Sequence, residues 1–404
     1  MFAATTYREV FQASANLAFA FPILAMEALI ILVAVWSGGR PFPALLRLST
    51  PTRIAALTWL VALTAVAFLT APYPAIAQIL LLIALVHAST ALALNDLLAG
   101  AWRNHGAALL TAAGWGALFY CVVAYGLLLA FRGSATFDWW HPGVGVSHVR
   151  QFAFYGLTAA AVGAGLCALR PASLTAFHLA CNLAFLAVGS GMCIWSGGRA
   201  AVGALLPSFA VAIALCPSPD RKRLAGLLLV GLLAGAALSS IWIPHETYGL
   251  PRLLSWVQPA ERGANAYTNG RLVMWQETLA AFIDRPVLGH GMGQFKFLVP
   301  SARSTFTHPH NSLLQLLFQW GIVGTAAMLV IVRPSGRAAL AAMRSRTRSA
   351  AATIALPVLS AHLAMSMLEG NLFHVYPTSV VVLALVVLAD SDRLPARSRA
   401  SASR

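Results

Sequence analysis

Long apolar runs constrain this chain more than any other feature of its sequence. Stretches of about 17 to 25 residues with few charges recur along its 404 residues. A bilayer core is about 30 Å thick and an α-helix rises about 1.5 Å per residue, so each run is long enough to cross it. The predicted spans lie near residues 15–36, 54–71, 74–94, 107–131, 150–168, 172–195, 199–216, 223–243, 310–332, 350–368 and 374–390.

The predicted fold class is all-α, a polytopic membrane helix bundle of about 11–12 transmembrane helices with one long periplasmic loop containing short helices. Helices satisfy their own backbone polar groups in lipid, which open strands do not. Charged residues make up 10% of the chain, against about 25% in soluble domains. We expect an N-terminal bundle over 1–243, a catalytic loop over 244–309, C-terminal helices over 310–390 and a basic cytoplasmic tail over 391–404.

Basic residues predict how the chain is oriented. Arg40, Arg47 and Arg53 share one connection, and further arginines fill every second connection after it, as the positive-inside rule expects of cytoplasmic segments. The net charge of +15 is therefore interpreted as topology and contact with membrane lipid, not nucleic-acid binding. The other connections, including 244–309, are then extracytoplasmic. Eleven spans place the N-terminus outside, and twelve place it inside.

Residues 244–309 form the one long hydrophilic segment of the sequence. A short helix is predicted there from residues at helical spacing, which are Arg271, Leu272, Trp275, Leu279 and Phe282. Arg271 and Trp275 share a face because they are four residues apart, and Pro286 ends the pattern. Glycines punctuate the following turn at 286–293, which either brings the backbone close to a ligand or only bends the chain.

The sequence Thr307-His308-Pro309-His310-Asn311-Ser312 leads directly into the apolar run that follows. Asn311 or Ser312 is a natural helix N-cap, which places His310 near the positive end of the helix dipole. That position disfavours the imidazolium and leaves a neutral base near pH 7. His308 is open to three roles: binding phosphate, orienting the base or shaping the turn. The alternatives are a pair of interfacial histidines without function, or a metal site, although no carboxylate or cysteine cluster accompanies them.

Arginines on the predicted outer side form the second group of candidates. Arg199 follows Ser196-Gly-Gly, Arg150 begins a span, and Arg271 and Arg303 lie in the long loop. Cations in outer connections run against the usual bias and invite an explanation. Each is either a snorkelling interface residue or part of a site for an anion, and guanidinium forks suit phosphate or pyrophosphate.

The ordered motifs resemble the O-antigen ligase family, which includes O-antigen polymerases. The family pattern runs Arg-x-x-x-Trp, then Pro-x-x-Gly-x-Gly, then His-x-His-Asn or His-Asn, then Gly-x-x-Gly on a helix. This sequence carries these motifs at Arg271 to Trp275, Pro286 to Gly291, His308 to Asn311 and Gly321 to Gly324. Ser196-Gly-Gly-Arg199 looks like the family's Ser-Arg-Gly segment with one glycine interposed, which makes Arg199 a less secure match than Arg271.

The resemblance implies a glycosyltransferase that uses neither metal nor cofactor and works on the periplasmic face of a bacterial inner membrane. Its donor would be a polysaccharide on undecaprenyl pyrophosphate, and its acceptor a sugar hydroxyl of the lipid A-core. His310 maps to the family's essential histidine, and Arg271 and Arg199 to its essential arginines. A neutral histidine suits a general base, and fixed arginines suit a pyrophosphate leaving group. Arg150, His308, Asn311, Trp275 and Arg303 are further candidates.

Three alternatives remain open at this stage. An O-antigen polymerase of the same family would use the same histidine and arginines. A lipid-linked glycan transporter would be expected to show repeats and mid-membrane charges, and Pro357 and His362 are the only hints of these. A structural or assembly protein would explain the hydropathy but not the ordered Arg, Trp, His and Asn motifs.

Overall fold

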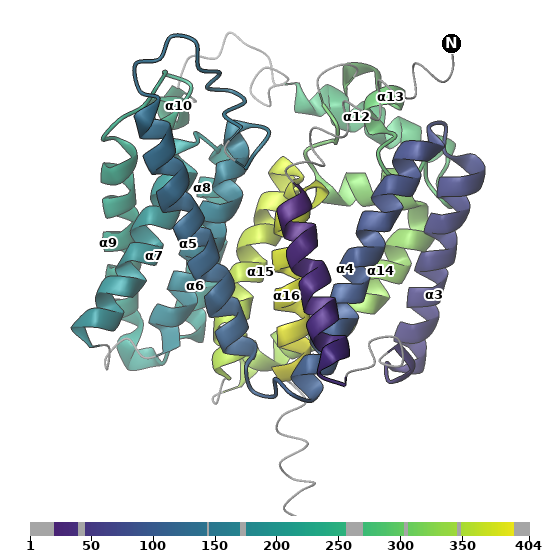
Figure 1. Cartoon of the computed structure of the whole chain (residues 1–404), viewed down its shortest axis with the longest axis horizontal. Coiled ribbons are helices and arrows are strands. Elements are labelled where there is room, and N and C mark those ends of the chain that lie inside the picture. Colours follow the sequence, from purple (N-terminus) through teal and green to yellow (C-terminus); the bar gives the residue numbers. More distant parts are fainter. Residues whose placement is uncertain are drawn as a thin grey trace, which may run out of the picture. The chain divides into compact units, whose positions relative to one another are not determined.

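The computed structural model describes residues 20–38, 45–143, 145–169, 175–255, 270–302, 306–345 and 349–391. Within these ranges the secondary structure is helical and contains no strand. Figure 1 shows long helices joined by short connections and a few short helices. The predicted all-α membrane bundle is confirmed.

Eight helices in the described ranges are long and apolar enough to cross a membrane, and three more apolar helices are shorter. All eleven coincide with predicted apolar runs, so the chain is a multi-pass membrane protein. The eight are Thr50–Thr70, Pro74–Ala99, Gly106–Ala130, Val149–Leu169, Ala176–Trp195, Ser218–Ser239, Ser312–Arg344 and Ala350–Glu369. The three are Ala20–Trp36, Arg199–Leu215 and Val375–Ser391.

The elements that come after the helix Ala20–Trp36 form two consecutive groups along the chain. The first group is α3 (Thr50–Ala65), η1 (Val66–Thr70), α4 (Pro74–Ala99), α5 (Gly106–Ala130), η2 (Val149–Gln151), α6 (Phe152–Leu169), α7 (Ala176–Trp195), α8 (Arg199–Leu215), η3 (Ser218–Asp220) and α9 (Arg221–Ser239). The second group is α10 (Gly249–Leu254), α12 (Arg271–Asp284), α13 (Phe295–Leu298), η5 (Pro300–Ala302), α14 (Ser312–Arg344), α15 (Ala350–Glu369), η6 (Asn371–Phe373) and α16 (Val375–Ser391).

The main difference from the predicted spans lies in α14. Hydropathy ends that run at residue 332, but the helix continues through Pro334 to Arg344. A hydropathy pattern marks the part of a helix that suits lipid, whereas the helical hydrogen bonds extend into the basic segment that follows. The short helix predicted from Arg271 onward is confirmed as α12, which ends at Asp284, two residues before Pro286.

The chain divides into two compact units, each built from several segments. Unit 1 comprises Met1–Leu97, Gln258–Pro334 and Ser366–Ser379, and unit 2 comprises Leu98–Val257, Ser335–Met365 and Val380–Arg404. The hydrophilic segment predicted over 244–309 therefore contributes residues to both units.

Unit 2 is organised around α6, which packs against α5, α7 and α8. Helices α5 to α9 run side by side in Figure 1. Glycines allow the close approach of α6 and α7, since a Cβ on Gly156 would lie 2.6 Å from the Gly189 carbonyl oxygen. Small residues at helix interfaces are typical of membrane bundles, where packing rather than burial from water drives association.

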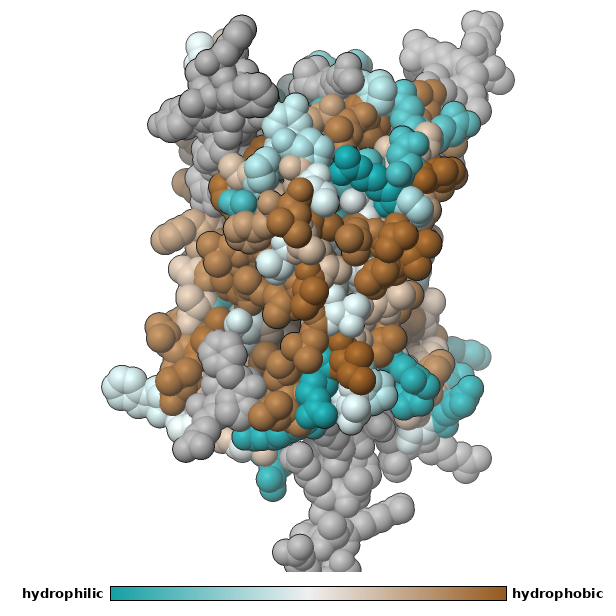
Figure 2. All heavy atoms as spheres, turned by 90° about the vertical axis from the view of Figure 1, so that its right-hand side faces the viewer, coloured by the Kyte–Doolittle hydropathy of each residue, from teal (hydrophilic) through white to brown (hydrophobic). Residues whose placement is uncertain are grey.

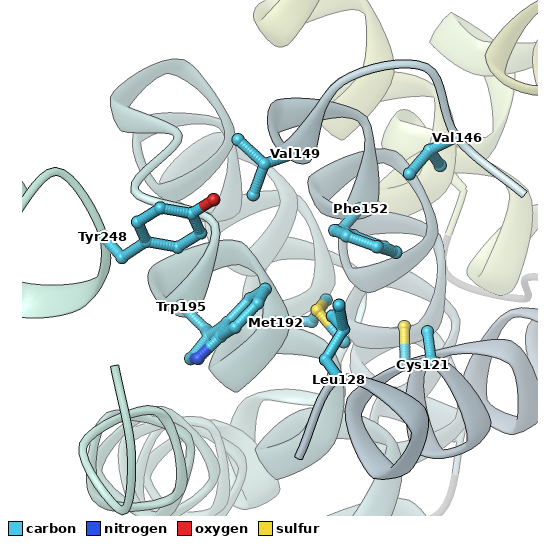
Figure 3. Close-up of a cluster of buried hydrophobic side chains, with 9 residues drawn as sticks. Cys121, Leu128, Val146, Val149, Phe152, Met192, Trp195 and Tyr248 are labelled. Carbon is cyan, nitrogen blue, oxygen red and sulfur yellow. The ribbon is translucent and has the colours of Figure 1, made fainter. Parts of the chain in front are cut away.

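An aromatic cluster closes one end of unit 2. Trp195 at the end of α7 contacts Phe152 at the start of α6 and Tyr248 just before α10, with ring centroids 6.1 and 5.3 Å apart. Figure 3 shows these rings turned toward one another above Met192 and Leu128. The cluster fixes the chain segments that flank Ser196 and Arg199.

Unit 1 contains α3, α4 and the first half of α14, whose small and apolar side chains form one buried cluster. Figure 2, seen from the side of α3, shows a broad hydrophobic band with hydrophilic residues gathered above and below it. A second buried cluster lies beneath the short helices and joins Met274 of α12, Phe295 of α13 and Phe318 of α14. This second cluster fixes α12 against the start of α14.

Candidate active site

The candidate site begins in the short segment before α14. The Asn311 Oδ1 accepts the backbone N–H of Leu314 at 3.1 Å, so Asn311 caps the helix. His310 adopts a left-handed backbone conformation with φ of 53°, which is uncommon for a residue with a side chain. The backbone N–H of His310 donates to the His308 Nδ1 at 3.2 Å. This bond places the proton of neutral His308 on Nε2 and makes His308 part of the turn that presents His310.

Helix α12 brings two of its side chains to the same region. Trp275 donates its Nε1–H to the Pro309 carbonyl oxygen at 2.7 Å and so holds the segment between the two histidines. Arg271, one turn earlier, donates through Nη1 to the Leu368 carbonyl oxygen at 2.5 Å. The predicted shared face of Arg271 and Trp275 therefore packs against the histidine segment and the end of α15.

The carboxylate of Glu369 completes this group of side chains. Its Oε2 lies 2.8 Å from the Arg271 Nη2, and its Oε1 lies 3.7 Å from the His310 Nδ1. The three side chains are 24%, 18% and 15% exposed for Arg271, Glu369 and His310 respectively. The site is thus largely shielded from solvent while each charged or titratable group keeps some access.

Burial controls the charge of His310. Burial lowers the pKa of its imidazole, and the nearby Glu369 carboxylate and carbonyl oppose that effect while Arg271 adds to it. The lowered pKa agrees with the predicted neutral imidazole, although burial rather than the helix dipole is the largest cause. A neutral His310 can accept a proton near pH 7.

His308 lies deeper than His310 and is closed in by aromatic rings. It stacks on Phe373 at 5.1 Å between centroids, and it meets the rings of His310 and His374 at 4.5 and 5.5 Å. Burial lowers the pKa of His308 well below its usual value, and His310, His374 and Arg271 lower it further. These contacts suit a neutral residue that shapes the turn.

The glycine-punctuated turn at 286–293 packs against α14, where Gly321 has non-helical angles and interrupts the helix. The freed Ile322 N–H donates to the Pro286 carbonyl oxygen at 2.8 Å, and His290 donates its own N–H to the Phe318 carbonyl oxygen at 2.8 Å. A Cβ on Gly289 would lie 2.6 Å from the Gly321 nitrogen. Of the two predicted roles, the glycines therefore serve close backbone packing between two chain segments.

Arg150 and Arg199 are placed together in unit 2, around the Ser196–Gly198 turn. Arg150 donates to the carbonyl oxygens of Ser196 and Thr247, the latter at 3.2 Å, and its guanidinium lies 5.6 Å from the Trp140 ring centroid. Arg199 donates through Nη2 to the Arg252 carbonyl oxygen at 3.1 Å and to the Ser255 hydroxyl at 3.2 Å.

The predicted site residues thus fall into two groups that belong to different compact units. Unit 1 joins Arg271, Trp275, His308, His310 and Asn311, whereas unit 2 joins Arg150 and Arg199. Arg303 lies outside the described residues. Across the described ranges, no group of three or more His, Cys, Asp or Glu side chains is placed to hold a metal ion.

Comparison with known proteins gives the site its context. Residues 184–329 match the family model described as O-antigen ligase. The chain carries an O-antigen ligase family domain. This domain runs from α7 to the first half of α14 and contains Arg199, Arg271, Trp275, His308, His310 and Asn311.

A curated relative supports the same family. The chain is 29% identical to the O-antigen ligase of Pseudomonas aeruginosa over 219 residues, which are 54% of this chain. The matched region spans 49% of that relative, about half its length. The predicted resemblance to the O-antigen ligase family is confirmed, and the enzyme class that it supports is of the ligase or glycosyltransferase type.

Glu369 is the site residue that the sequence analysis missed. It lies outside the residues matched by the O-antigen ligase domain and at the end of an apolar span. The chain has 12 acidic residues, and Glu369 is the only one between Asp284 and Asp390. An isolated acid at a span boundary in such a sequence is a usable signal, but nothing local pairs it with Arg271.

Proposed function

We propose that this chain is an O-antigen ligase. It transfers O-antigen polysaccharide from undecaprenyl pyrophosphate to a sugar hydroxyl of the lipid A-core, on the periplasmic face of the bacterial inner membrane. The observation that carries the proposal is the placement of His310, whose Nδ1 faces the Glu369 carbonyl oxygen at 3.3 Å beside Arg271. The family domain contains both His310 and Arg271 and supports the same function.

His310 acts in this proposal as the general base. A carbonyl oxygen accepts but does not donate, so the bond to Glu369 keeps a proton on Nδ1 and leaves the Nε2 lone pair available. Nε2 takes the proton of the acceptor hydroxyl as its oxygen attacks the anomeric carbon. A positioned base of this kind contributes roughly 10²- to 10⁴-fold to a rate.

Arginines stabilise the leaving group in place of a metal ion. The bond from the anomeric carbon to the pyrophosphate breaks, and its electron pair leaves with undecaprenyl pyrophosphate. Arg271 in unit 1 and Arg150 and Arg199 in unit 2 supply fixed positive charge for that group. In-line attack with a single displacement inverts the anomeric configuration.

The test is a transfer assay with purified protein in lipid. The protein receives an undecaprenyl-pyrophosphate glycan and a lipid A-core acceptor, with chelator present and no nucleotide, and transfer is followed on a gel. Wild type should modify the acceptor, and His310→Ala should not. His105→Ala is the matched control, because His105 lies in an exposed turn and bonds through its ring to the Arg103 carbonyl oxygen.

The outcomes separate the alternatives. Longer glycan that stays on its lipid carrier would replace the ligase with a polymerase of the same family. Activity that disappears with chelator would contradict a metal-independent reaction. Retained anomeric configuration in the product, read by NMR, would contradict single displacement. Equal activity of His310→Ala and His105→Ala would remove His310 from the mechanism.

A further inference from the structure

The C-terminal end of α15 contacts three of the side chains that carry the family motifs. The last four carbonyl groups of a helix have no partner within the helix and must be satisfied by other donors. Here the Met367 carbonyl oxygen accepts from the Asn311 Nδ2 at 3.2 Å, and the Leu368 carbonyl oxygen accepts from the Arg271 Nη1 at 2.5 Å. The Glu369 carbonyl oxygen accepts from the His310 Nδ1 at 3.3 Å.

The carboxylate of Glu369 adds charge to this arrangement of carbonyls. It forms an ion pair with Arg271 through Oε2 at 2.8 Å, while Oε1 faces the His310 Nδ1 at 3.7 Å. One carboxylate therefore lies between the proposed base and the arginine. Because α12, the histidine segment and α15 are distant in sequence, Glu369 links three separate parts of the chain.

The chain after Glu369 fits closely around the histidines. Gly370 has φ of 58°, a left-handed conformation that favours glycine. A Cβ at this position would lie 2.7 Å from the His308 Nδ1 and 3.2 Å from the His310 Cα. The end of α15 is thus built to approach the histidine segment directly.

We infer that Glu369 is a positioning residue of the transferase site, which holds His310 in the Nδ1–H tautomer and orients the guanidinium of Arg271. This inference rests on the proposed function. Glu369 itself need not touch either sugar. It acts through His310, whose Nε2 it keeps unprotonated, and through Arg271, whose Nη1 and Nη2 it and the preceding carbonyl hold in place.

The groups around His310 determine the expected pH effect. Arg271 faces it from α12, His308 from its own segment and Glu369 from α15. Glu369 is the member of this set that raises the pKa of His310, against the lowering by burial and Arg271. Removing its charge should therefore lower the pKa of His310 further and make Nε2 a weaker base.

Glu369→Gln is the decisive variant, because its amide oxygen can still accept from Arg271 while the negative charge is lost. Glu277→Gln is the matched control, since Glu277 belongs to the same unit and accepts the Ser301 N–H at 2.8 Å. Glu369→Asp retains the charge on a shorter side chain. All three are compared with wild type in lipid nanodiscs after a check of folding by thermal unfolding.

Two measurements are made on each variant. Histidine labelled with ¹⁵N reports the tautomer and pKa of His310, with its signal assigned by loss in His310→Ala. The transfer assay gives kcat/KM against pH. We expect the Nδ1–H tautomer in wild type, and in Glu369→Gln a lower His310 pKa, an acid limb of kcat/KM moved to lower pH and a roughly 10- to 100-fold lower maximum. Glu369→Asp should keep the acid limb near its wild-type position, and Glu277→Gln should match wild type throughout.

The outcomes test the inference separately from the proposed function. A His310 pKa and acid limb that do not move in Glu369→Gln would overturn the inference, even where the rate falls, because that result describes a merely structural residue. An Nε2–H tautomer in wild type would overturn it as well. If Glu369→Gln does not fold, a Glu369→Asp protein with an acid limb as far displaced as that of a neutral variant would also contradict it. The expected tautomer and pKa shift without any transfer would retain the positioning role and reject the ligase function.

Discussion

Unit 1 contains two histidines that face a glutamate, and the two pairs are built differently. In the first, His87 of α4 lies with its Nδ1 2.8 Å from the Glu27 Oε1, and the side chains are 11% and 1% exposed. In the second, His310 lies 3.7 Å from the Glu369 Oε1, and the side chains are 15% and 18% exposed. The first pair joins two apolar helices within their length, and the second lies where α15 ends.

The difference shows that a histidine beside a carboxylate is not by itself an active site. The His87–Glu27 pair lies within apolar helices, as expected for polar groups in a bundle interior, where pairing offsets part of their desolvation cost. The His310–Glu369 pair adds a third charged group, Arg271, and a set of helix-end carbonyls. We therefore expect the first pair to affect stability and the second to affect the reaction.

The largest expected effect comes from replacing each histidine by asparagine. An asparagine amide can donate from nearly the position of Nδ1 but has no counterpart of Nε2. His310→Asn should lower the rate of transfer roughly 10²- to 10⁴-fold, the range for loss of a general base. His87→Asn should leave the rate per folded molecule within about twofold, because its Nδ1 contact is the one that it needs.

Initial rates normalised to folded protein provide the measurement. Size-exclusion profiles and thermal unfolding in the same detergent give the folded fraction of each variant. If His87→Asn lost as much activity as His310→Asn, the pair within the apolar helices would belong to the functional machinery, and the distinction between the two pairs would be wrong.

The next largest effect concerns stability and the Glu27 carboxylate. Removing one member of a buried ion pair costs about 3–5 kcal/mol, because the other is left unsatisfied, whereas apolar replacement of both is often close to neutral. Glu27→Leu should therefore lower the melting temperature strongly. The double variant Glu27→Leu/His87→Leu should recover most of that loss.

Thermal unfolding followed by tryptophan fluorescence measures both variants. The same pair of changes at the other site, Glu369→Leu with His310→Leu, gives the contrast: it should abolish transfer whatever its stability. A double variant at Glu27 and His87 that was no more stable than the single one would show that the two side chains do not act as a pair.

The sequence predicted local features of this molecule well because local chemistry determines them. Hydropathy located the apolar helices, helical spacing located α12, and the cap at Asn311 follows from the preference of its side chain for a helix start. The position of His310 at the end of a patterned loop was predicted for the same reason. Each of these depends on neighbours within a few residues.

The missing features depend on contacts between distant residues. Arg271 and Glu369 are 98 positions apart, so no local pattern connects them. The turn at 286–293 was predicted, but not that it packs into α14 at Gly321, because the break in that helix becomes visible only in the tertiary structure. The division of the predicted arginines between two compact units likewise has no local signal.

A smaller effect is expected in the framework that supports the second pair. Gly289→Ala should destabilise the protein by about 1–3 kcal/mol, since φ is +71° and the new methyl carbon would meet the Gly321 nitrogen at 2.6 Å. Gly270→Ala is the matched control, because its φ of +80° is similar but no atom lies within 4 Å of a Cβ there. The difference in melting temperature between the two isolates the steric contact from the backbone strain.

Transfer activity of the two glycine variants extends the comparison to function. Gly289→Ala should lower the rate per folded molecule, because the turn and α14 together carry the segment that presents His310. A Gly289→Ala protein as stable and active as Gly270→Ala would mean that the close packing at Gly321 adjusts without consequence, and that the second pair does not depend on this framework.

The smallest expected effect is a change in how stability depends on pH. The folded-state pKa of His308 lies well below its usual value of 6.5, mainly through burial. Below pH 6.5 the unfolded chain binds a proton at this residue and the folded chain does not, so stability is full above that pH and falls as the pH drops toward the folded pKa. His308→Asn removes this titration while its amide oxygen can still accept the His310 N–H. Melting temperatures between pH 5 and 8 should therefore fall less steeply toward acid in His308→Asn than in wild type. Equal slopes would indicate that His308 titrates normally in the folded protein and that it is not held as the neutral acceptor on which the turn before His310 depends.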